Sequence, residues 1–373
     1  MNKLYMSILN AVAKKPNSIN VLSSFLAAFA GVLLGFVIMI IVSPQNAFGA
    51  FSDMLFGPFA NMTRIGMVVR SSIPIMLTGL SVAFAFRTGL FNIGASGQMM
   101  IGGVLAIYVG LNWTFLGSFH WVAGVIVGML GGAAWGAIPG LLKAFRNVHE
   151  VVASIMLNYI ALYVARLLVL RTMFDNNYGA SRELPLSAEI PTWFLPDLFG
   201  GTKVNVGIFI ALTAVILIHI LLNRTTIGFE LKSVGLSRPA AQYAGIRERK
   251  SIVVSMVVAG CLAGLAGALY YLDVDRRYGV SADIVTHGFT GIAIALLALS
   301  APLGVILAAF FYASIYRGGW LIQRAYREEI IDIIIGFIIY FSALSLFTKN
   351  VIANYLRKKT KREIELEEKV GDV

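Results

Sequence analysis

The sequence has little charge for its length and almost no cysteine. Only 13% of its 373 residues are charged, against about 25% in a typical soluble domain, so polar side chains are too few to cover a water-soluble globule. The single cysteine, Cys261, has no second cysteine with which to form an internal disulfide. The chain is instead 58% hydrophobic, with a mean hydropathy of +0.79. These values indicate an integral membrane protein.

The sequence also lacks the motifs of nucleotide hydrolysis and of metal catalysis. It contains no Gly-x-x-x-x-Gly-Lys-Ser/Thr phosphate loop, so we do not expect this chain to bind ATP in that way. It contains no His-Glu-x-x-His motif and no Cys/His cluster, and its four histidines are scattered. We therefore expect no enzyme activity, no metal and no cofactor in this chain.

About ten apolar segments approach or reach the roughly 20 residues that cross a bilayer as a helix. None has the alternation of a membrane β-barrel, and lipid requires the backbone to satisfy itself in helices. The second, third and eighth segments are short, which predicts broken or re-entrant helices. The expected fold is an all-α integral membrane protein with helices near residues 21–43, 71–86, 98–111, 120–142, 151–170, 205–223, 251–271, 288–299, 303–320 and 330–347.

Basic residues are concentrated in alternate loops, as in the cytoplasmic loops of membrane proteins. With a cytoplasmic N-terminus, the inner segments hold 19 Lys and Arg and the outer segments hold 10. This bias predicts that both termini are cytoplasmic, and it accounts for the net charge of +11 without nucleic acid. The first apolar run is too long for a signal-peptide core, so we expect it to be retained. The expected organisation is a cytoplasmic segment (1–20), a transmembrane domain (21–347) and a charged cytoplasmic tail (348–373), with an external loop at 171–204 and a cytoplasmic loop at 224–250.

Glycines recur every four residues in the fourth apolar segment. On a helix they form one smooth ridge that lets a neighbouring backbone approach closely. The seventh segment repeats the pattern, so the two ridges suit either packing within one subunit or an interface between subunits. The positions are Gly124, Gly128, Gly132, Gly136 and Gly140, then Gly260, Gly264 and Gly267.

Residues 87–98 interrupt two apolar segments with three glycines and several polar side chains. Irregular backbone at membrane depth requires surrounding protein or a water-filled cavity. Asn92, Ser96 and Gln98 would offer hydrogen bonds to a polar, uncharged solute, and Phe91 would offer a ring for stacking. The alternative is an ordinary glycine-rich cytoplasmic loop. A similar glycine spacing at Gly288 and Gly291 fits two five-helix halves of inverted topology.

Three further features lie later in the chain. Glu150 suits capping of a helix start, while Asn158 lies deeper, where polar side chains face protein or a cavity. The basic loop 226–246 carries a short helix that Pro239 begins and Gly245 ends, and its small apolar surface suits docking to another protein or packing on its own membrane domain. Arg166 and Asp332 are expected as buried charges within membrane helices that pair with each other.

These stretches resemble the permeases of ABC importers for simple sugars and branched-chain amino acids, in the branch associated with nucleoside uptake. The resemblance is carried by residues 88–98, 147–152, 156–159 and 228–246. Members of that family often have Glu where Ser96 stands. The resemblance implies a substrate path at Phe91, Asn92, Ser96, Gln98 and Asn158. It also implies coupling to an ATPase at Gly228, Glu230, Gly235, Pro239, Ala240, Ala241, Tyr243 and Gly245.

The same resemblance implies a set of partners in the cell membrane. They are a second, related permease subunit, a cytoplasmic ABC ATPase that carries ATP and Mg²⁺, and an extracellular binding lipoprotein or periplasmic protein. The expected function is a permease subunit that forms the path for a purine or pyrimidine nucleoside. The alternatives are the same machine with ribose or another simple sugar as cargo, and a secondary transporter driven by an ion gradient.

Overall fold

The computed structural model describes residues 16–280 and 283–344, which are mostly helical. The chain forms two compact units, one within residues 1–51 and 323–373 and the other over Ser52–Ile322. The expected tail at 348–373 and most of the expected N-terminal segment at 1–20 lie outside the described residues.

The first unit pairs the two ends of the described chain. It holds α2 (Pro16–Val42), the beginning of α3 (Ala47–Phe56) and α15 (Glu328–Ala343), and α2 and α15 pack on each other. Just before α15, the Tyr326 hydroxyl donates to the carbonyl oxygens of Met39 and Ser43, at 3.0 and 3.1 Å. These bonds tie the segment before α15 to the end of α2, where both carbonyls also accept backbone N–H groups.

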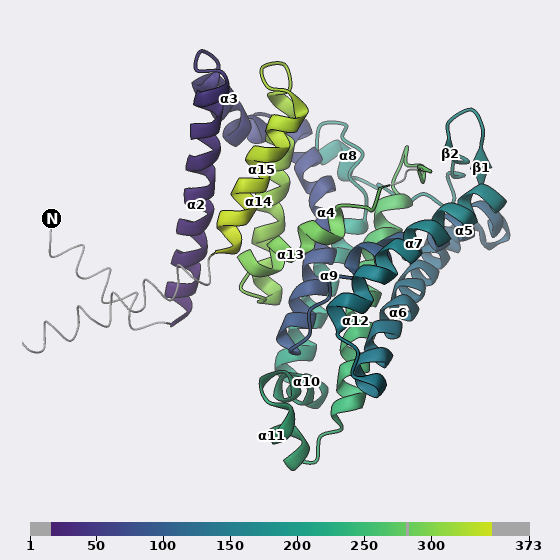
Figure 1. The fold of residues 1–373 in the computed structure, drawn as a ribbon. Helices are drawn as coiled ribbons and strands as arrows, with labels where there is room; N and C mark the ends of the chain where they lie inside the picture. Colours follow the sequence, from purple (N-terminus) through teal and green to yellow (C-terminus); the bar gives the residue numbers. More distant parts are fainter. Residues whose placement is uncertain (1–15, 281–282, 345–373) are drawn as a thin grey trace, which may run out of the picture. The chain divides into compact units, whose positions relative to one another are not determined.

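The second unit contains the remaining elements (Figure 1). Its helices are η1 (Gly57–Phe59), α4 (Met62–Arg87), α5 (Ala95–Asn112), η2 (Thr114–Phe119), α6 (His120–Arg146), α7 (Glu150–Thr172), α8 (Leu195–Leu198), α9 (Gly207–Arg224), α10 (Thr226–Leu236), α11 (Arg238–Tyr243), α12 (Glu248–Tyr271), α13 (His287–Leu297) and α14 (Pro302–Leu321). The helices α4 and α12 pack on each other, and between them they contact α5, α6, α9, α13 and α14.

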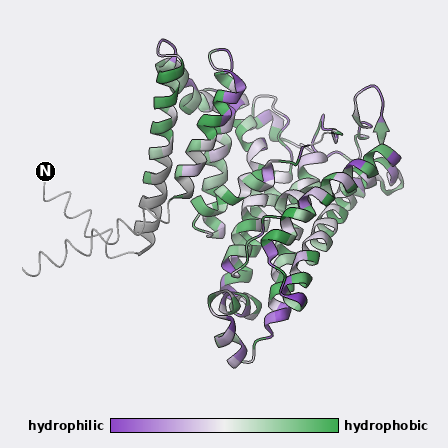
Figure 2. Ribbon diagram, in the orientation of Figure 1, coloured by the Kyte–Doolittle hydropathy of each residue, from purple (hydrophilic) through white to green (hydrophobic). Residues whose placement is uncertain are grey.

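Seven helices of the described chain are long and apolar enough to cross a membrane. They are α4, α5, α6 with the preceding η2, α7, α9, α12 and α14, and the shorter apolar helices lie at Phe29–Val42 and His287–Leu297. Each of the ten expected segments overlaps a helix of the described residues, the last of them as far as Ala343. The chain is therefore a multi-pass membrane protein, and Figure 2 shows long apolar stretches along these helices.

The expected shortness of the second segment is wrong, because α4 runs unbroken for 26 residues. Its first turns carry Thr63, Arg64 and Arg70, which lower the local hydropathy without ending the helix. The Asn61 side chain caps the start by accepting a hydrogen bond from the Arg64 backbone at 2.8 Å. By contrast α13 has only 11 residues, so the eighth segment is short as predicted.

The chain is not wholly helical, since the 171–204 loop contains a small hairpin. Strands β1 (Phe174–Asp175) and β2 (Ala180–Ser181) pair antiparallel, and Ala180 also bridges to Gly279. Arg277 joins the two loops, with ion pairs to Asp175 at 3.3 Å and to Glu183 at 2.6 Å. Hydropathy does not reveal so short a hairpin, because the two strands have only two residues each.

The glycine ridges of α6 and α12 pack on each other within the second unit. A Cβ placed on Gly132 would collide with the backbone of Gly260 and Gly264, and one on Gly128 would lie 2.7 Å from the Gly102 carbonyl oxygen of α5. The two glycine ridges therefore pack on each other inside the subunit. The close approach of their backbones strengthens the van der Waals contact between α6 and α12. The opposite faces of α6 and α7 expose large apolar side chains such as Leu130 and Ile160, as lipid-facing helices do.

Candidate functional site

The break between α4 and α5 is the first part of the candidate site. The α4 helix ends at Arg87, α5 begins at Ala95, and Gly89 adopts a left-handed conformation with φ of +73°. Only glycine takes this conformation without steric cost. The backbone therefore changes direction where the glycines predicted an interruption, and its polar side chains are enclosed by helices.

Two amide side chains from this break pair with each other. Asn92 donates to the Gln98 side-chain oxygen at 2.8 Å, and Gln98 donates back to Asn92 at 3.0 Å. Asn92 also donates to the Ser81 hydroxyl of α4 at 3.0 Å. All three side chains are buried. Because their hydrogen bonds are used within the protein, a solute reaches these amides only after a rearrangement of the cluster.

Asn158 of α7 holds the start of α5 in place. Its side-chain oxygen accepts from the Gly97 amide at 2.9 Å, and its nitrogen donates to the Ile93 carbonyl at 3.1 Å. The sequence prediction placed Asn158 at membrane depth facing protein or a cavity, and the side chain is buried against protein. Among the described residues, the buried hydroxyls of Ser96 and Ser154 have no hydrogen-bond partner.

The starts of α5 and α13 touch at this point. A Cβ on Gly288 would overlap the backbone and hydroxyl of Ser96, including the Ser96 Cα at 2.5 Å. Gly291, one turn further on, lies against the backbone of Thr78 and Gly79 in α4. The two glycine patterns that resemble each other in sequence therefore sit on helices that begin beside one another.

Phe91 lies apart from the amide cluster. Its half-buried ring stacks on Phe86 with centroids 4.9 Å apart and planes inclined by 24°. The structure thus brings together Asn92, Ser96, Gln98 and Asn158, while Phe91 packs on the end of α4. Their use as a solute path is a prediction that these contacts do not test.

The loop between α9 and α12 forms two helices, of which the sequence predicted the second, α11. Thr225 caps α10 through the Gly228 amide at 3.1 Å, Ser237 caps α11 through the Ala240 amide at 3.4 Å, and Gly245 follows with φ of +79°. Gly228 and Ala241 are buried, whereas Glu230, Pro239, Ala240, Tyr243 and Gly245 are exposed. Exposed fractions of 88% for Leu236 and 95% for Tyr243 leave a large apolar surface in this loop.

The inner face of this loop touches the break between α4 and α5. A Cβ on Gly235 would lie 2.7 Å from the Gly89 nitrogen and 2.7 Å from the Thr88 carbonyl carbon. Thr88 in turn hydrogen-bonds Ser255 of α12 through their hydroxyls. The α10 helix is therefore in backbone contact with the segment that leads into the amide cluster. One face of the loop packs on the membrane domain, as the second reading expects, and docking of the exposed face to another protein stays a prediction.

Arg166 and Asp332 lie on α7 and α15, and both side chains are exposed. The chain's own atoms leave both positions open, so their burial within the membrane stays a prediction. Their pairing with each other stays a prediction. Glu150 does begin α7, as expected for an acid at a helix start, and pairs with Lys143 at 2.9 Å.

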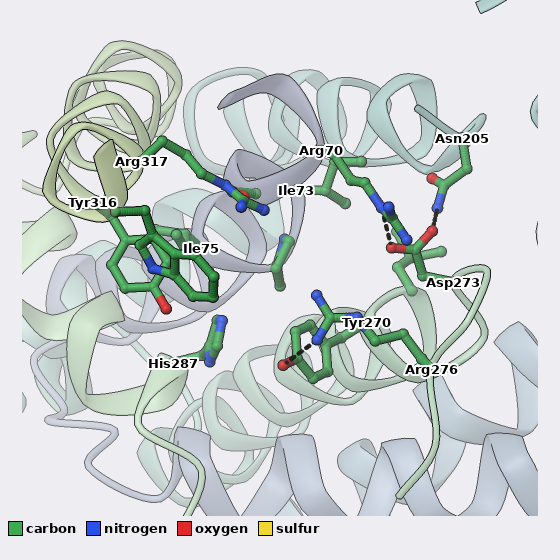
Figure 3. Close-up of a pocket in the computed structure, with 14 residues that line it drawn as sticks. Arg70, Ile73, Ile75, Asn205, Tyr270, Asp273, Arg276, His287, Tyr316 and Arg317 are labelled. Carbon is green, nitrogen blue, oxygen red and sulfur yellow. Dashed lines mark hydrogen bonds and ion pairs between the residues drawn. The ribbon is translucent and has the colours of Figure 1, made fainter. Parts of the chain in front are cut away.

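Sequence reasoning missed a polar cavity of about 190 Å³ at the other end of the second unit (Figure 3). It lies where α4 begins and where α12 and α14 end, whereas α10 and α11 lie beyond the end of α9. Its lining includes Arg70, Asn205, Tyr270, Asp273, Arg276, His287, Tyr316, Arg317 and Trp320. One sequence signal could have revealed this cavity: arginines and aromatic residues recur at the same end of several helices. The charge count had assigned these arginines to the outer segments.

Asp273 organises one side of this cavity. It accepts from Arg70 at 2.6 Å and from Asn205 at 2.7 Å, and it lies just beyond the end of α12. Arg70 also donates to the Val274 carbonyl at 2.8 Å. Burial raises the pKa of the Asp273 carboxyl above its ordinary value, while the Arg70 guanidinium opposes that rise. The Arg70–Asp273 pair thus joins the start of α4 to the end of α12.

Comparison with known proteins finds a matching family model and several similar permeases. The family model described as the permease component of the branched-chain amino acid transport system matches residues 64–343. The guanosine ABC transporter permease NupP of Bacillus subtilis (strain 168) is 36% identical over 342 residues, covering 91% of this chain and 97% of that protein. The nucleoside ABC transporter permease NupB of Lactococcus lactis subsp. cremoris (strain MG1363) is 33% identical, covering 87% and 91%. A glucose ABC transporter permease of Haloferax volcanii is 29% identical, covering 83% and 82%.

Proposed function

We propose that this chain, which belongs to the family of branched-chain amino acid transport system permease components, is the permease subunit of an ATP-driven importer. We propose further that its cargo is a nucleoside. The observation that carries the proposal is the similarity, over about nine-tenths of the chain, to permeases named for guanosine and for nucleosides. A simple sugar is the second candidate cargo, because one relative is named for glucose.

The proposed architecture has ten membrane helices in two inverted five-helix halves, with both termini in the cytoplasm. It is supported by seven long apolar helices and by the shorter α13, whose start meets that of α5. In this arrangement residues 21–347 form the membrane domain, the 171–204 loop is external, and the 224–250 loop is cytoplasmic. Inverted repeats that meet at broken helices are a common plan for transporters.

The proposed solute path runs past Asn92, Ser96, Gln98 and Asn158, with Phe91 available for stacking on a base. Support comes from the buried amide pair and the unpartnered Ser96 hydroxyl at the start of α5. Alternating access would exchange the internal hydrogen bonds of this cluster for bonds to the solute. The buried amides would then lose few hydrogen bonds during transport.

The proposed drive is a cytoplasmic ABC ATPase that docks on the exposed surface of α10 and α11. A push on α11 would reach the amide cluster through the backbone contact of Gly235 with Gly89. The remaining proposed partners are a second, related permease subunit and an extracellular binding protein. ATP and Mg²⁺ would belong to the ATPase.

Uptake of labelled nucleosides tests this function directly. Membrane vesicles that contain the chain with its partners should accumulate nucleoside only when ATP is supplied on the cytoplasmic side. The purified chain reconstituted alone should move no nucleoside uphill. Concentrative uptake by the chain alone under an ion gradient would instead identify a secondary transporter.

A further inference from the structure

The cavity that sequence reasoning missed gathers three guanidinium groups. Those of Arg70, Arg276 and Arg317 come from α4, from the loop after α12 and from α14, and Figure 3 shows them directed toward a common space. The volume of about 190 Å³ is many times the roughly 10–15 Å³ that admits one water molecule. The cavity therefore has room for part of an organic solute.

The charges of the lining do not cancel. Among the described residues that line the cavity, Asp273 is the sole carboxylate, and it pairs with Arg70 at 2.6 Å. Arg276 donates to the Tyr270 hydroxyl at 2.8 Å, and Arg317 donates to the Ser71 hydroxyl at 2.6 Å. Hydroxyl partners leave both positive charges in place. Two guanidiniums therefore supply N–H donors and positive potential to the cavity, which favours solutes rich in acceptors and disfavours cations.

Rings form much of the remaining wall. Tyr270 lies beneath the Arg276 guanidinium at 4.4 Å from the ring centroid and packs on the His287 ring at 4.9 Å. Tyr316 and Trp320 extend the aromatic lining from α14, with ring centroids 6.4 Å apart. Flat rings beside fixed N–H donors suit a flat heterocycle that stacks on one face and accepts hydrogen bonds at its edge.

The cavity adjoins the buried amide cluster. His287 lines the cavity, and the next residue, Gly288, lies against the backbone and hydroxyl of Ser96. The start of α13 therefore links the wall of the cavity to the unpartnered Ser96 hydroxyl. The cavity therefore lies next to a helix start that also contacts the proposed solute path.

We propose that this cavity binds nucleosides through the base and selects purines with a carbonyl group at the 6-position over purines with an amino group there. The proposal rests on the proposed function. A guanidinium fork donates two hydrogen bonds to a carbonyl oxygen and the neighbouring ring nitrogen of a 6-oxopurine. A 6-aminopurine presents the N–H groups of its amino substituent at the same edge. These donors would face the N–H donors of the guanidiniums, so no hydrogen bond would form between them.

Inosine and adenosine provide the matched pair, because they differ at the 6-position of the base and share the ribose. Binding of each tritiated nucleoside is measured on the purified full-length chain in lipid nanodiscs. Inosine should bind at least tenfold more tightly than adenosine, since a site built of donors leaves buried groups unpaired when the solute lacks the acceptor. Inorganic phosphate serves as competitor and should displace inosine poorly, because it has no ring to stack.

Arg276→Gln and Arg317→Gln should each weaken inosine binding about tenfold and change adenosine binding less than twofold. Arg171→Gln, which removes an exposed arginine away from the cavity, should change neither. Equal affinity of the wild-type chain for both nucleosides, equal loss of both in the variants, or tighter binding of phosphate than of inosine would each overturn the proposal.

Together, the binding and uptake measurements distinguish failure of the cavity proposal from failure of the proposed function. If vesicles accumulate nucleosides with ATP but the chain binds no inosine in the cavity, the selection site is wrong and the importer stands. If vesicles that contain the chain with its partners accumulate sugars and no nucleoside, the cargo itself is wrong.

Discussion

At the residue scale, the buried side chain of Asn158 holds the backbone of the α4–α5 break in place. Its amide bonds two backbone groups of the α4–α5 break, the Gly97 N–H at 2.9 Å and the Ile93 carbonyl at 3.1 Å. A buried backbone group without a partner costs about 1–3 kcal/mol. Asn158 therefore fixes the geometry of the break and does more than offer a polar surface.

We predict that Asn158→Ala destabilises the protein by roughly 1–3 kcal/mol and lowers nucleoside uptake, because the start of α5 loses its anchor. Thermal unfolding of the purified variant and ATP-dependent uptake at matched membrane levels provide the two measurements. Asn112→Ala is the control, since Asn112 is exposed at the end of α5, where its side chain donates to the Tyr108 carbonyl. Stability and uptake equal to those of the control would remove Asn158 from this role.

At the element scale, the glycines determine how closely helices approach. The contact of α6 with α12 depends on the absence of side chains at Gly132, Gly260 and Gly264, where each Cβ would meet backbone of the other helix. Backbone cannot turn aside as a flexible side chain can. The spacing of the helices is therefore sensitive to a single added methyl group.

We predict that Gly132→Ala destabilises the protein by about 1–3 kcal/mol through overpacking. Gly336→Ala is the matched control, because a Cβ at Gly336 on α15 meets no atom within 4 Å. The unfolding midpoint in detergent should fall for the first variant and hold or rise for the second. A midpoint for Gly132→Ala at or above that of Gly336→Ala contradicts the packing argument.

The contact of α10 with the break gives a second prediction at this scale. Gly235→Ala should slow ATP-dependent uptake severalfold while the ATPase still associates, because the added Cβ pushes α10 away from Gly89 without altering the exposed face. Co-purification of the ATPase and uptake in vesicles separate the two effects. Gly279→Ala, whose Cβ meets no atom within 4 Å, should leave both unchanged. Normal uptake by Gly235→Ala would show that force does not pass through this contact.

At the scale of the whole molecule, the proposed membrane orientation rests on the charge bias and has a simple test. Cys261 is the single cysteine, so a Cys261→Ser background accepts one reporter cysteine at a time. Tyr178→Cys and Tyr243→Cys place reporters at positions exposed by 67% and 95%, on the 171–204 loop and on α11.

We predict that a membrane-impermeant maleimide labels the Tyr178→Cys variant in intact cells and labels the Tyr243→Cys variant only after permeabilisation. The physical reason is the excess of Lys and Arg in the segments assigned to the cytoplasm. The reverse labelling pattern would place α10 and α11 outside and remove the docking surface for a cytoplasmic ATPase.

The sequence by itself determined the membrane-spanning class, the approximate positions of the long apolar helices and the ends of α11. Runs of apolar side chains and local hydrogen-bonding residues act over a few neighbours, so they can be read along the chain. The sequence also placed Asn92 and Gln98 at a break in the apolar pattern, and Asn158 within an apolar segment.

Only the tertiary structure decided how distant residues meet. It paired Asn92 with Gln98, set Gly235 against Gly89 and brought Arg70 to Asp273, 203 positions away. It also corrected the length of the second segment, since polar residues in the first turns of α4 lower the hydropathy without ending the helix. The cavity arises because the ends of α4, α12 and α14 lie together, and that proximity depends on helix packing across the chain.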